Sequence, residues 1–440
     1  MTRRKTLGVA IVVILLASAA MVAALLVQSG DSRADMVADA RVQAADVVPL
    51  DAAAVARGHA VAIAGDCAAC HTRPAGHAAA SQGTPYAGGY AIETPFGSIV
   101  STNITPDRKT GIGDWTERDF FQAVRHGRSP SGLLYPAMPY PSYVQISDTD
   151  MHDLWSYMRS LKPVSNDSGG THLGFPYNIR LLMAGWNLLF FENHAFAADQ
   201  SRPAEWNRGR YLVDALGHCG GCHTAKNALG GDKTYLAGGA LQGWYAPALD
   251  NGTEHGLGNW SQDDLIAYLK IGSNNHAIAA GPMAEEVERS SQFMPPADLA
   301  AISTYLKSRP GPAHDRSTAL ATSDPEMLRG AHIYTAACSA CHAPKGEGIP
   351  GLATHLADNP ATRADNPASL IHVLMKGGRG AVTSGNPTGG GMPSFAWKLS
   401  DGDAAAVLTY IRNSWGNAAP AVEAGQIAKA RSDLGARKAM

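Results

Sequence analysis

The sequence has few charged residues, no cysteine outside three short motifs, and only one long apolar run. Charged residues make up 17% of the 440 residues, and the formal net charge is −2. No stripe of lysine and arginine is present, which argues against a nucleic-acid partner. The chain also lacks the G-x-S-x-G pattern that presents the nucleophile of many serine hydrolases. The composition therefore gives no indication of nucleic-acid binding or serine hydrolase chemistry, and the cysteines are the remaining reactive residues with a regular pattern.

All six cysteines belong to three copies of the pattern Cys-x-x-Cys-His. The cysteines are Cys67, Cys70, Cys219, Cys222, Cys338 and Cys341, and the histidines that follow them are His71, His223 and His342. This pattern is the attachment signature of c-type haem. On a helical turn, positions i, i+3 and i+4 share one face, so two thiols can form thioethers to one porphyrin while the imidazole reaches its iron. The sequence therefore predicts three covalently bound haem c groups.

Three other roles for these cysteines account less well for the Cys-x-x-Cys-His pattern. Disulfides would give no reason for a histidine after each pair. A structural zinc site draws four ligands from neighbouring pairs, whereas these pairs lie far apart in the sequence. A thioredoxin-like motif would need a single pair beside a βαβ pattern, and no such pattern is visible. Haem attachment remains the prediction.

The haem motif is part of a longer repeat. Each copy has an Arg-Gly pair before the first cysteine and ends in an amphipathic helix that carries a tyrosine. The pairs begin at Arg57, Arg208 and Arg329, the helices are expected over residues 153–161, 298–307 and 403–414, and the tyrosines are Tyr157, Tyr305 and Tyr410. A glycine- and tryptophan-containing element recurs at 111–116 and 256–261, and the third repeat lacks its tryptophan. A mainly α chain with three tandem haem domains is expected.

Composition and repeats together predict the order of segments along the chain. Residues 1–30 form a membrane anchor or signal peptide, 31–50 a tether, 51–165 the first domain, 166–202 an apolar linker, 203–310 the second domain, 311–324 a linker, 325–416 the third domain, and 417–440 a loose tail. A length of 440 residues suits about three ordinary domains.

The N-terminus indicates export from the cytoplasm. Arg3, Arg4 and Lys5 precede an uncharged apolar run at residues 7–27, which is long enough to span a bilayer. The small residues at 17–19 also fit a signal-peptide cleavage site, so an anchor and a removed signal both stay open. Either way, the basic residues before the run place the rest of the chain outside the cytoplasm.

A second apolar cluster occupies residues 181–191, between the first two predicted domains. It either packs against the protein's own domains or forms a surface for a partner subunit or a membrane, because contiguous apolar surface tends to mark such sites.

Each iron needs a ligand opposite its histidine, and a methionine there raises the reduction potential of the haem. Met138 and Met392 each precede a proline in the first and third repeats. The second repeat offers both Met283 and Met294. Met294 is too close along the chain to Tyr305 for a ligand loop as long as those of the other repeats, so Met283 is predicted.

Ligation by two histidines is the alternative, with His276 as the candidate in the second repeat. With both axial positions filled, no iron would be open to oxygen, peroxide or substrate. This predicts electron transfer, with no catalytic residue and no substrate site. A haem peroxidase, or a c-type haem subunit of a terminal oxidase, would be the alternative functions.

The order of elements resembles the triheme cytochrome c subunits of membrane-bound bacterial dehydrogenases, which serve alcohol, aldehyde, gluconate and sugar dehydrogenases. The resemblance covers residues 50–415 and is carried by the segments at 94–97, 101–107 and 281–283, with the haem motifs and their methionines. It implies class I cytochrome c domains and the haem-ligand roles given above. It also implies a periplasmic catalytic dehydrogenase subunit as partner, with a small iron–sulfur or accessory subunit, and ubiquinone as electron acceptor. The expected location is the periplasmic face of the cytoplasmic (inner) membrane of a Gram-negative bacterium.

Two features bear on the type of partner. The long apolar N-terminus and residues 184–191 are similar to those of cytochromes that serve molybdenum hydroxylases, such as aldehyde or nicotinate dehydrogenases. Subunits of quinoprotein alcohol dehydrogenases more often have a longer region after the third domain than follows Trp415 here. A molybdenum-type partner is therefore favoured, ahead of a pyrroloquinoline quinone (PQQ) alcohol dehydrogenase and a flavin-dependent gluconate or sugar dehydrogenase.

Overall fold

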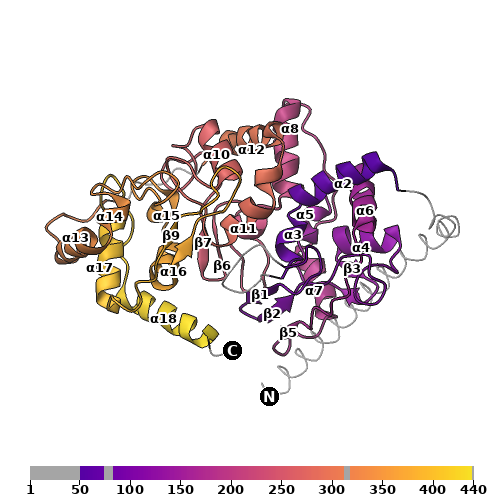
Figure 1. Cartoon of the computed structure of the whole chain (residues 1–440), viewed down its shortest axis with the longest axis horizontal. Helices are drawn as coiled ribbons and strands as arrows, with labels where there is room; N and C mark the ends of the chain where they lie inside the picture. Colours follow the sequence, from indigo (N-terminus) through magenta and orange to yellow (C-terminus); the bar gives the residue numbers. More distant parts are fainter. Residues whose placement is uncertain (1–49, 74–82, 312–317, 439–440) are drawn as a thin grey trace, which may run out of the picture. The chain divides into compact units, whose positions relative to one another are not determined.

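The computed structural model describes residues 50–73, 83–311 and 318–438. Helices dominate these residues and the strands are short, as expected for a mainly α chain (Figure 1). The chain divides into two compact units. The first holds the described residues before Ala60 together with 91–195, and the second holds those of 60–90 together with those from 196 onward. The apolar run at 7–27 lies outside the described residues, and within them no helix is long and apolar enough to cross a membrane.

The first compact unit combines helices with a small antiparallel sheet. Its helices are α4 (Glu117–His126), α5 (Tyr140–Tyr143), α6 (Asp148–Ser160), α7 (Leu182–Phe190) and the first part of α2 (Ala52–Ala64). Strand β2 (Gly97–Val100) lies between β1 (Ala91–Thr94) and β5 (His172–Leu173), and β3 (Arg128–Ser129) pairs with β4 (Gly132–Leu133). The register places Ala91 opposite Val100 and Gly97 opposite Leu173.

The second compact unit contains the three haem motifs and most of the second and third repeats. From the first motif to the second repeat, its elements are the rest of α2, α3 (Cys67–Cys70), α8 (Ala204–Tyr211), the π-helical turn η2 (Leu212–Leu216), α9 (Gly220–His223), β6 (Gly239–Leu241), β7 (Trp244–Ala246), α10 (Gln262–Ile271), α11 (Pro282–Arg289), η3 (Ser291–Phe293) and α12 (Pro296–Ser308). The third repeat adds α13 (Pro325–Ala337), α14 (Ser339–His342), α15 (Pro360–Arg363), α16 (Ala368–Lys376), β8 (Gly378–Arg379), β9 (Gly391–Met392), α17 (Asp401–Arg412) and α18 (Ala424–Lys438).

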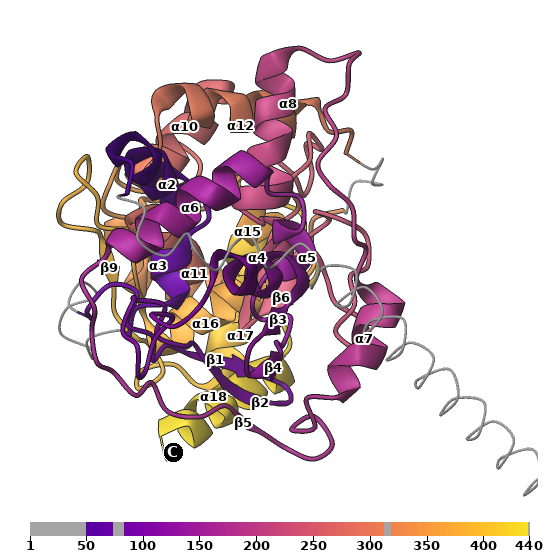
Figure 2. The same ribbon diagram turned by 90° about the vertical axis from the view of Figure 1, so that its right-hand side faces the viewer.

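The glycine of each Arg-Gly pair lies where the first helix of a repeat crosses its closing helix. A Cβ added to the glycine would overlap a carbonyl oxygen of the closing helix, at 1.8 Å for Gly58, 1.9 Å for Gly209 and 2.3 Å for Gly330. Figure 2 shows α8 beside α12, and Figure 1 shows α13 beside α17. The three expected closing helices are confirmed as α6, α12 and α17, although α6 begins earlier than predicted.

The same crossings are held by ion pairs from the neighbouring arginines. The shortest nitrogen-to-oxygen distances are 2.7 Å for Arg57–Asp153, 2.8 Å for Arg208–Asp298 and 2.8 Å for Arg329–Asp403. Glycine lets the two backbones approach, and the adjacent arginine binds a carboxylate of the closing helix. The Arg-Gly pair is therefore a structural feature of each repeat.

The recurrent glycine–tryptophan element leads directly into a capped helix. Thr116 accepts a hydrogen bond from the backbone N–H of Asp119 at the start of α4, and Ser261 accepts one from Asp264 at the start of α10. In both cases the aspartate side chain accepts from the backbone N–H of the capping residue, which completes a capping box. These reciprocal bonds fix where the two helices begin.

The C-terminal segment differs from the loose tail that the sequence predicts. Val422 and Ile427 are buried in the core of the third repeat, with Ile427 0% exposed. Arg431 donates hydrogen bonds to Asp401 Oδ1 and to the carbonyl oxygens of Ala396 and Leu399. Ile427 and Arg431 thus attach α18 to the domain, and Val422 attaches the segment just before the helix. Such sparse contacts leave no clear pattern in an alanine-rich sequence.

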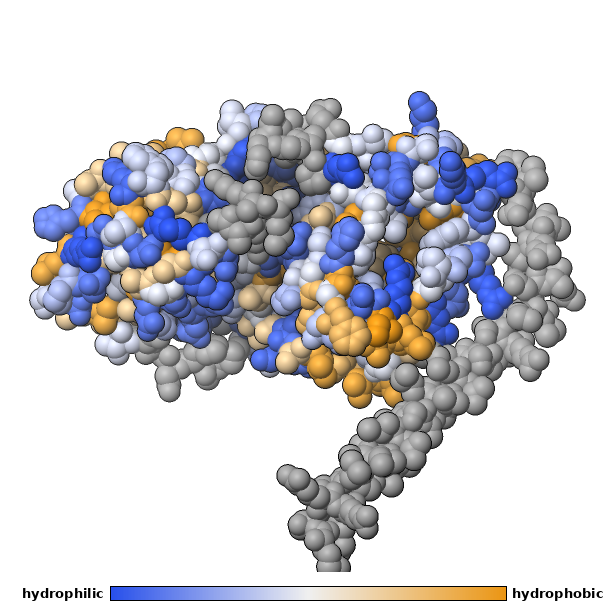
Figure 3. All heavy atoms as spheres, turned by 90° about the horizontal axis from the view of Figure 1, so that it is seen from below, coloured by the Kyte–Doolittle hydropathy of each residue, from blue (hydrophilic) through white to orange (hydrophobic). Residues whose placement is uncertain are grey.

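The predicted apolar cluster around α7 has one packed side and one exposed side. Ala184 and Asn187 are buried in the first unit, and Tyr140 donates a hydrogen bond of 2.7 Å to Asn187 Oδ1. Leu188 and Leu189, by contrast, are 66% and 67% exposed. Further exposed apolar side chains occur just before α7, at Phe175, Tyr177, Ile179 and Leu181, and at its first residue, Leu182. Figure 3 shows apolar side chains gathered in orange patches on the molecular face seen from below.

Candidate functional site

Each Cys-x-x-Cys-His motif forms a single helical turn. The backbone N–H of the histidine donates to the carbonyl oxygen of the first cysteine, at 3.0 Å for His71, 2.9 Å for His223 and 2.9 Å for His342. These i to i+4 bonds place the two cysteines and the histidine along one side of the turn. The helical turn expected for this pattern is therefore present in all three copies.

The imidazoles of the second and third motifs are oriented by backbone carbonyl groups. His223 Nδ1 lies 2.6 Å from the carbonyl oxygen of Pro247, and His342 Nδ1 lies 3.0 Å from that of Thr354. A carbonyl oxygen can only accept, so Nδ1 carries the proton and Nε2 keeps its lone pair for a metal. Burial lowers the pKa of both histidines, which favours the neutral, metal-binding form.

Five of the six cysteines are at least half-buried, and Cys341 is exposed. Burial raises the pKa of Cys67 and Cys70 to about 12. It raises the pKa of Cys222 and Cys338 to about 11. The thiols therefore border weakly solvated surroundings of the kind that an apolar macrocycle needs.

A threonine follows the histidine in the first two motifs and has a structural role that the sequence analysis missed. Thr72 and Thr224 are buried. Their hydroxyl oxygens accept from the backbone N–H groups of Tyr86 and Leu236, at 3.4 and 3.0 Å. These bonds fix the chain as it leaves each motif. The repeated Cys-x-x-Cys-His-Thr sequence was the signal that could have revealed them.

The methionines predicted as iron ligands are half-buried, and they occur in different settings. Met138 precedes α5 in the first compact unit. Met283 lies in the first turn of α11 and packs against a small cluster that includes Val287. Met392 lies on β9 and packs against the third-repeat core. Met294, the rival in the second repeat, is only 5% exposed.

His276, the candidate for bis-histidine ligation, lies between two carboxylates. Its Nε2 is 3.5 Å from Asp264 Oδ2, and its Nδ1 is 3.6 Å from Asp358 Oδ2. The ring also stacks on Trp260, with centroids 5.4 Å apart and an interplanar angle of 15°. Both nitrogens therefore face acidic groups, and the ring connects the second repeat to the third.

A group of carboxylates adjoins the first motif and α11 within the second compact unit. Burial, reinforced by the charge of Glu286, raises the pKa of Asp66 well above its usual value. Burial also raises the pKa of Glu286 to about 7, although Ser291 donates a hydrogen bond to it. Glu285 accepts a 3.2 Å hydrogen bond from Tyr90. Burial thus favours the protonated forms of Asp66 and Glu286 beside the first motif.

The geometry of three haem-type turns agrees with a comparison of the whole chain with known families. The cytochrome c family model matches residues 55–162, 207–310 and 327–415, and each match contains one motif. The chain belongs to the cytochrome c family. The three matched segments are therefore cytochrome c domains, and the first lies over residues of both compact units.

Relatives from several dehydrogenases are similar over most of this cytochrome c chain. The gluconate 2-dehydrogenase cytochrome c subunit of Pantoea cypripedii is 40% identical, over 87% of this chain and 90% of the relative. The fructose dehydrogenase cytochrome subunit of Gluconobacter japonicus is 38% identical, over 90% and 87%. A nicotinate dehydrogenase subunit of Pseudomonas putida is 39% identical over 87% of this chain, but the match spans only 32% of that longer relative.

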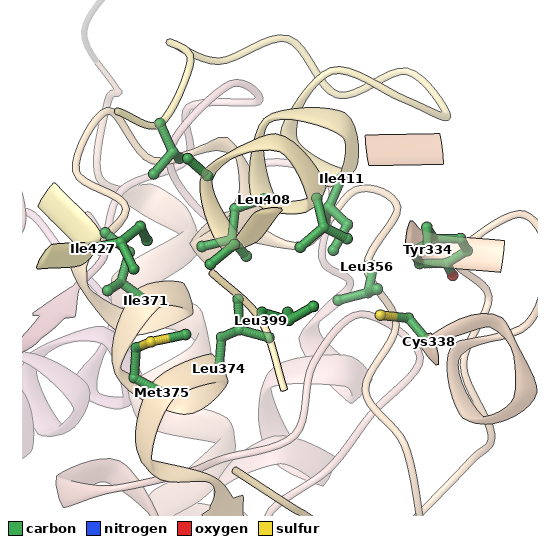
Figure 4. Close-up of a cluster of buried hydrophobic side chains, with 14 residues drawn as sticks. Tyr334, Cys338, Leu356, Ile371, Leu374, Met375, Leu399, Leu408, Ile411 and Ile427 are labelled. Atoms are coloured by element: carbon green, nitrogen blue, oxygen red, sulfur yellow. The ribbon is translucent and has the colours of Figure 1, made fainter. Parts of the chain in front are cut away.

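Cytochrome c domains bind haem c covalently, and the residues of this chain fit that group. Each turn supplies two thiols and one imidazole, the donor set that haem c requires. In the third domain, Cys338 belongs to the buried cluster shown in Figure 4, and Met392 packs against the same cluster. The structure thus brings a proposed attachment residue and a proposed axial ligand to one apolar core.

Proposed function

We propose that this cytochrome c is the three-haem electron-transfer subunit of a dehydrogenase complex. The observation that carries the proposal is the repeated helical turn, in which two cysteines and a histidine share one side. The same turn occurs once in each of the three matched domains. A bound haem supplies an iron that is reversibly oxidised and reduced by one electron.

The residues of each domain divide into attachment and ligand roles. Haem attachment would use the thiols of Cys67 and Cys70, of Cys219 and Cys222, and of Cys338 and Cys341. The irons would be held by His71, His223 and His342, with Met138, Met283 and Met392 as the proposed second ligands. The carbonyl groups of Pro247 and Thr354 hold two of the imidazoles in the orientation needed for Nε2 ligation.

The surroundings of the two candidate methionines support Met283 in the second domain. Met294 is 5% exposed and so is already enclosed by protein atoms. Met283 is half-buried and starts a helix, which leaves part of its side chain without protein contacts. His276 is paired with Asp264 and Asp358, which favours methionine over histidine as the second ligand.

Replacing Met283 tests the ligand assignment directly. We expect Met283→Ala to lower the reduction potential of one haem, because a methionine ligand raises it, and to leave covalent attachment intact. Met294→Ala is the matched control, since it removes the same side chain from the core and should leave all three potentials unchanged. Spectroelectrochemical titration of the purified protein measures both variants. Three unchanged potentials in Met283→Ala would contradict the assignment.

The proposed partner is a catalytic dehydrogenase subunit, accompanied by a small iron–sulfur or accessory subunit. The relatives named for gluconate, fructose and nicotinate dehydrogenases support such a partner, and their identities to this chain are nearly equal. Similar relatives are cytochrome c subunits of quinone alcohol dehydrogenases. We favour a molybdenum-hydroxylase-type partner on the N-terminal and α7 sequence features.

Purification from native membranes tests the partner. The tagged cytochrome should retain a catalytic subunit, which metal and cofactor analysis can then identify. Molybdenum with iron–sulfur clusters would support the favoured partner. Pyrroloquinoline quinone or flavin would replace it with an alcohol or sugar dehydrogenase. A haem-only preparation would contradict the role as a dehydrogenase subunit.

We further propose that the complex works at the periplasmic face of the inner membrane and reduces ubiquinone. The exposed apolar side chains at 175–189 support a membrane-facing surface in the first unit. The apolar run at residues 7–27 supports membrane targeting. Reduction of a ubiquinone analogue by the purified complex in lipid vesicles tests the acceptor. Electron transfer to soluble acceptors only would contradict it.

A further inference from the structure

The second and third cytochrome c domains meet at strand β7 and helix α16. Trp244 on β7 packs against His372 on α16, with ring centroids 4.4 Å apart and an interplanar angle of 30°. Beside it, the backbone N–H of Tyr245 donates to Ser369 Oγ at 2.8 Å. The Ser369 hydroxyl in turn donates to the Tyr245 carbonyl oxygen at 3.0 Å. An aromatic contact and two hydrogen bonds therefore fix the strand on the helix.

Within the second domain, β7 adjoins both proposed axial-ligand segments. Pro247 directly follows the strand, and its carbonyl oxygen lies 2.6 Å from His223 Nδ1. On the other side, the Trp244 indole lies against Gly281, where an added Cβ would be 2.5 Å from the ring. Gly281 has a φ of +58° and precedes Met283 by two residues. The indole thus packs against the turn that presents the proposed methionine ligand.

Within the third domain, the C-terminal end of α16 adjoins the segment that carries Met392. Ser394 Oγ donates to the carbonyl oxygen of Met375 at 2.6 Å, and Phe395 N–H donates to that of Leu374 at 2.9 Å. Strand β8 follows α16 and pairs with β9, with Gly378 opposite Met392. His372 therefore lies on the helix that supports the methionine segment of the third domain.

A second contact also joins the second and third domains. The Thr354 carbonyl oxygen accepts from His342 Nδ1, and the Thr354 hydroxyl accepts from the backbone N–H of Ile278 at 3.2 Å. Ile278 belongs to the second domain, and His342 is the proposed axial histidine of the third. The two domains therefore touch at a second place, where Thr354 also orients the proposed axial histidine of the third domain.

We propose that the Trp244–His372 contact is the route by which an electron passes between the haems of the second and third domains. The inference rests on the proposed function, because it requires a haem in each domain. Electron tunnelling weakens steeply across gaps that packed atoms do not fill, and the two rings are in direct contact between β7 and α16. One electron crosses per event, so one iron is oxidised from Fe(II) to Fe(III) while the other is reduced from Fe(III) to Fe(II). No bond forms or breaks and no proton moves.

The test measures electron equilibration between haems in the complete protein after rapid photoreduction. Trp244→Leu should slow the exchange between the second and third haems severalfold, with haem content, ligand spectra and the three potentials unchanged. Trp244→Phe keeps an aromatic ring and should retain most of the rate. Trp397→Leu is the matched control, because Trp397 is 82% exposed in the third domain, and it should have no effect.

The outcomes separate this inference from the proposed function. Equilibration as fast as in the wild type for Trp244→Leu would overturn it. Slowing that occurs only with altered methionine ligation would also overturn it, since Trp244 would then act by positioning Met283. If Trp244→Leu fails to fold, His372→Leu and His372→Phe provide the same comparison from the other ring. A wild-type protein with fewer than three haems would instead contradict the proposed function.

Discussion

Gly209 allows a quantitative test of the helix crossing on which each cytochrome c domain is built. An alanine Cβ at this position would lie 1.9 Å from the carbonyl oxygen of Ala301 and 2.9 Å from Tyr305 Cβ. Both atoms belong to the backbone of α12 or are attached directly to it, so no flexible side-chain end can move aside. The helices must separate, and overpacking of this kind costs about 2 kcal/mol. We therefore expect Gly209→Ala to weaken the packing of α8 on α12.

Amide hydrogen exchange measures this loss helix by helix in the intact three-domain protein. A cost of about 2 kcal/mol corresponds to roughly thirtyfold faster exchange in α8 and α12. The matched control is Gly425→Ala on α18, where an added Cβ meets nothing within 4 Å. Alanine is the better helix former, so Gly425→Ala should leave exchange in α18 equal or slower.

The comparison between the two variants decides the outcome. If exchange in α8 and α12 of Gly209→Ala matched the wild type, the crossing would tolerate a methyl group and the role of the Arg-Gly pair would be refuted. Faster exchange throughout the chain would indicate general destabilisation, and it too would count against a local crossing. The expected result is a loss confined to the two crossing helices.

Two further predictions concern the third domain. Asp403 has a pKa below its ordinary value because Ser400 and then Arg329 donate hydrogen bonds to it. The ionised carboxylate therefore stabilises the folded domain fully above the unfolded-state pKa. This stabilisation is lost as the pH falls through the lowered folded-state pKa. Asp403→Asn should cost about 1 kcal/mol near neutral pH, and hydrogen exchange in α13 and α17 should show this difference shrink in acid; a constant difference would exclude the carboxylate as its source. Arg431→Ala should release α18 at a cost of about 2 kcal/mol, seen as faster proteolysis after residue 417, whereas Lys429→Ala removes only an exposed ion pair and should not. Equal cleavage of both variants would contradict the role of Arg431.

The local structure around the haem motifs could be predicted because it depends on neighbours in the sequence. In a helical turn, the spacing of Cys219, Cys222 and His223 places their side chains on the same side. The structure has this helical turn. The repeats also predicted the closing helix of each copy, and the structure gives the reason for the glycines in the close approach at Gly58, Gly209 and Gly330. Periodicity and repetition are properties of the chain itself.

Other parts of the site left little or no signal in the sequence. The groups that orient His223 and His342 are backbone carbonyl oxygens, which every residue possesses, so nothing marks Pro247 or Thr354 in advance. The loose tail was expected because the segment is rich in alanine, yet a few contacts such as those of Ile427 fix α18 on the third domain. Contacts this sparse are visible only when the packed domain is known.

The sequence by itself determined the haem chemistry, the number of repeats and the family, because these depend on which side chains recur and at what spacing. The tertiary structure decided which elements of different repeats touch. Trp244 and His372 are distant in the chain, and their contact results from the packing of β7 on α16. Packing depends on the shape of whole surfaces rather than on the spacing of a few residues. For that reason the haem motifs could be recognised in the sequence, whereas the contact proposed to carry electrons required the fold.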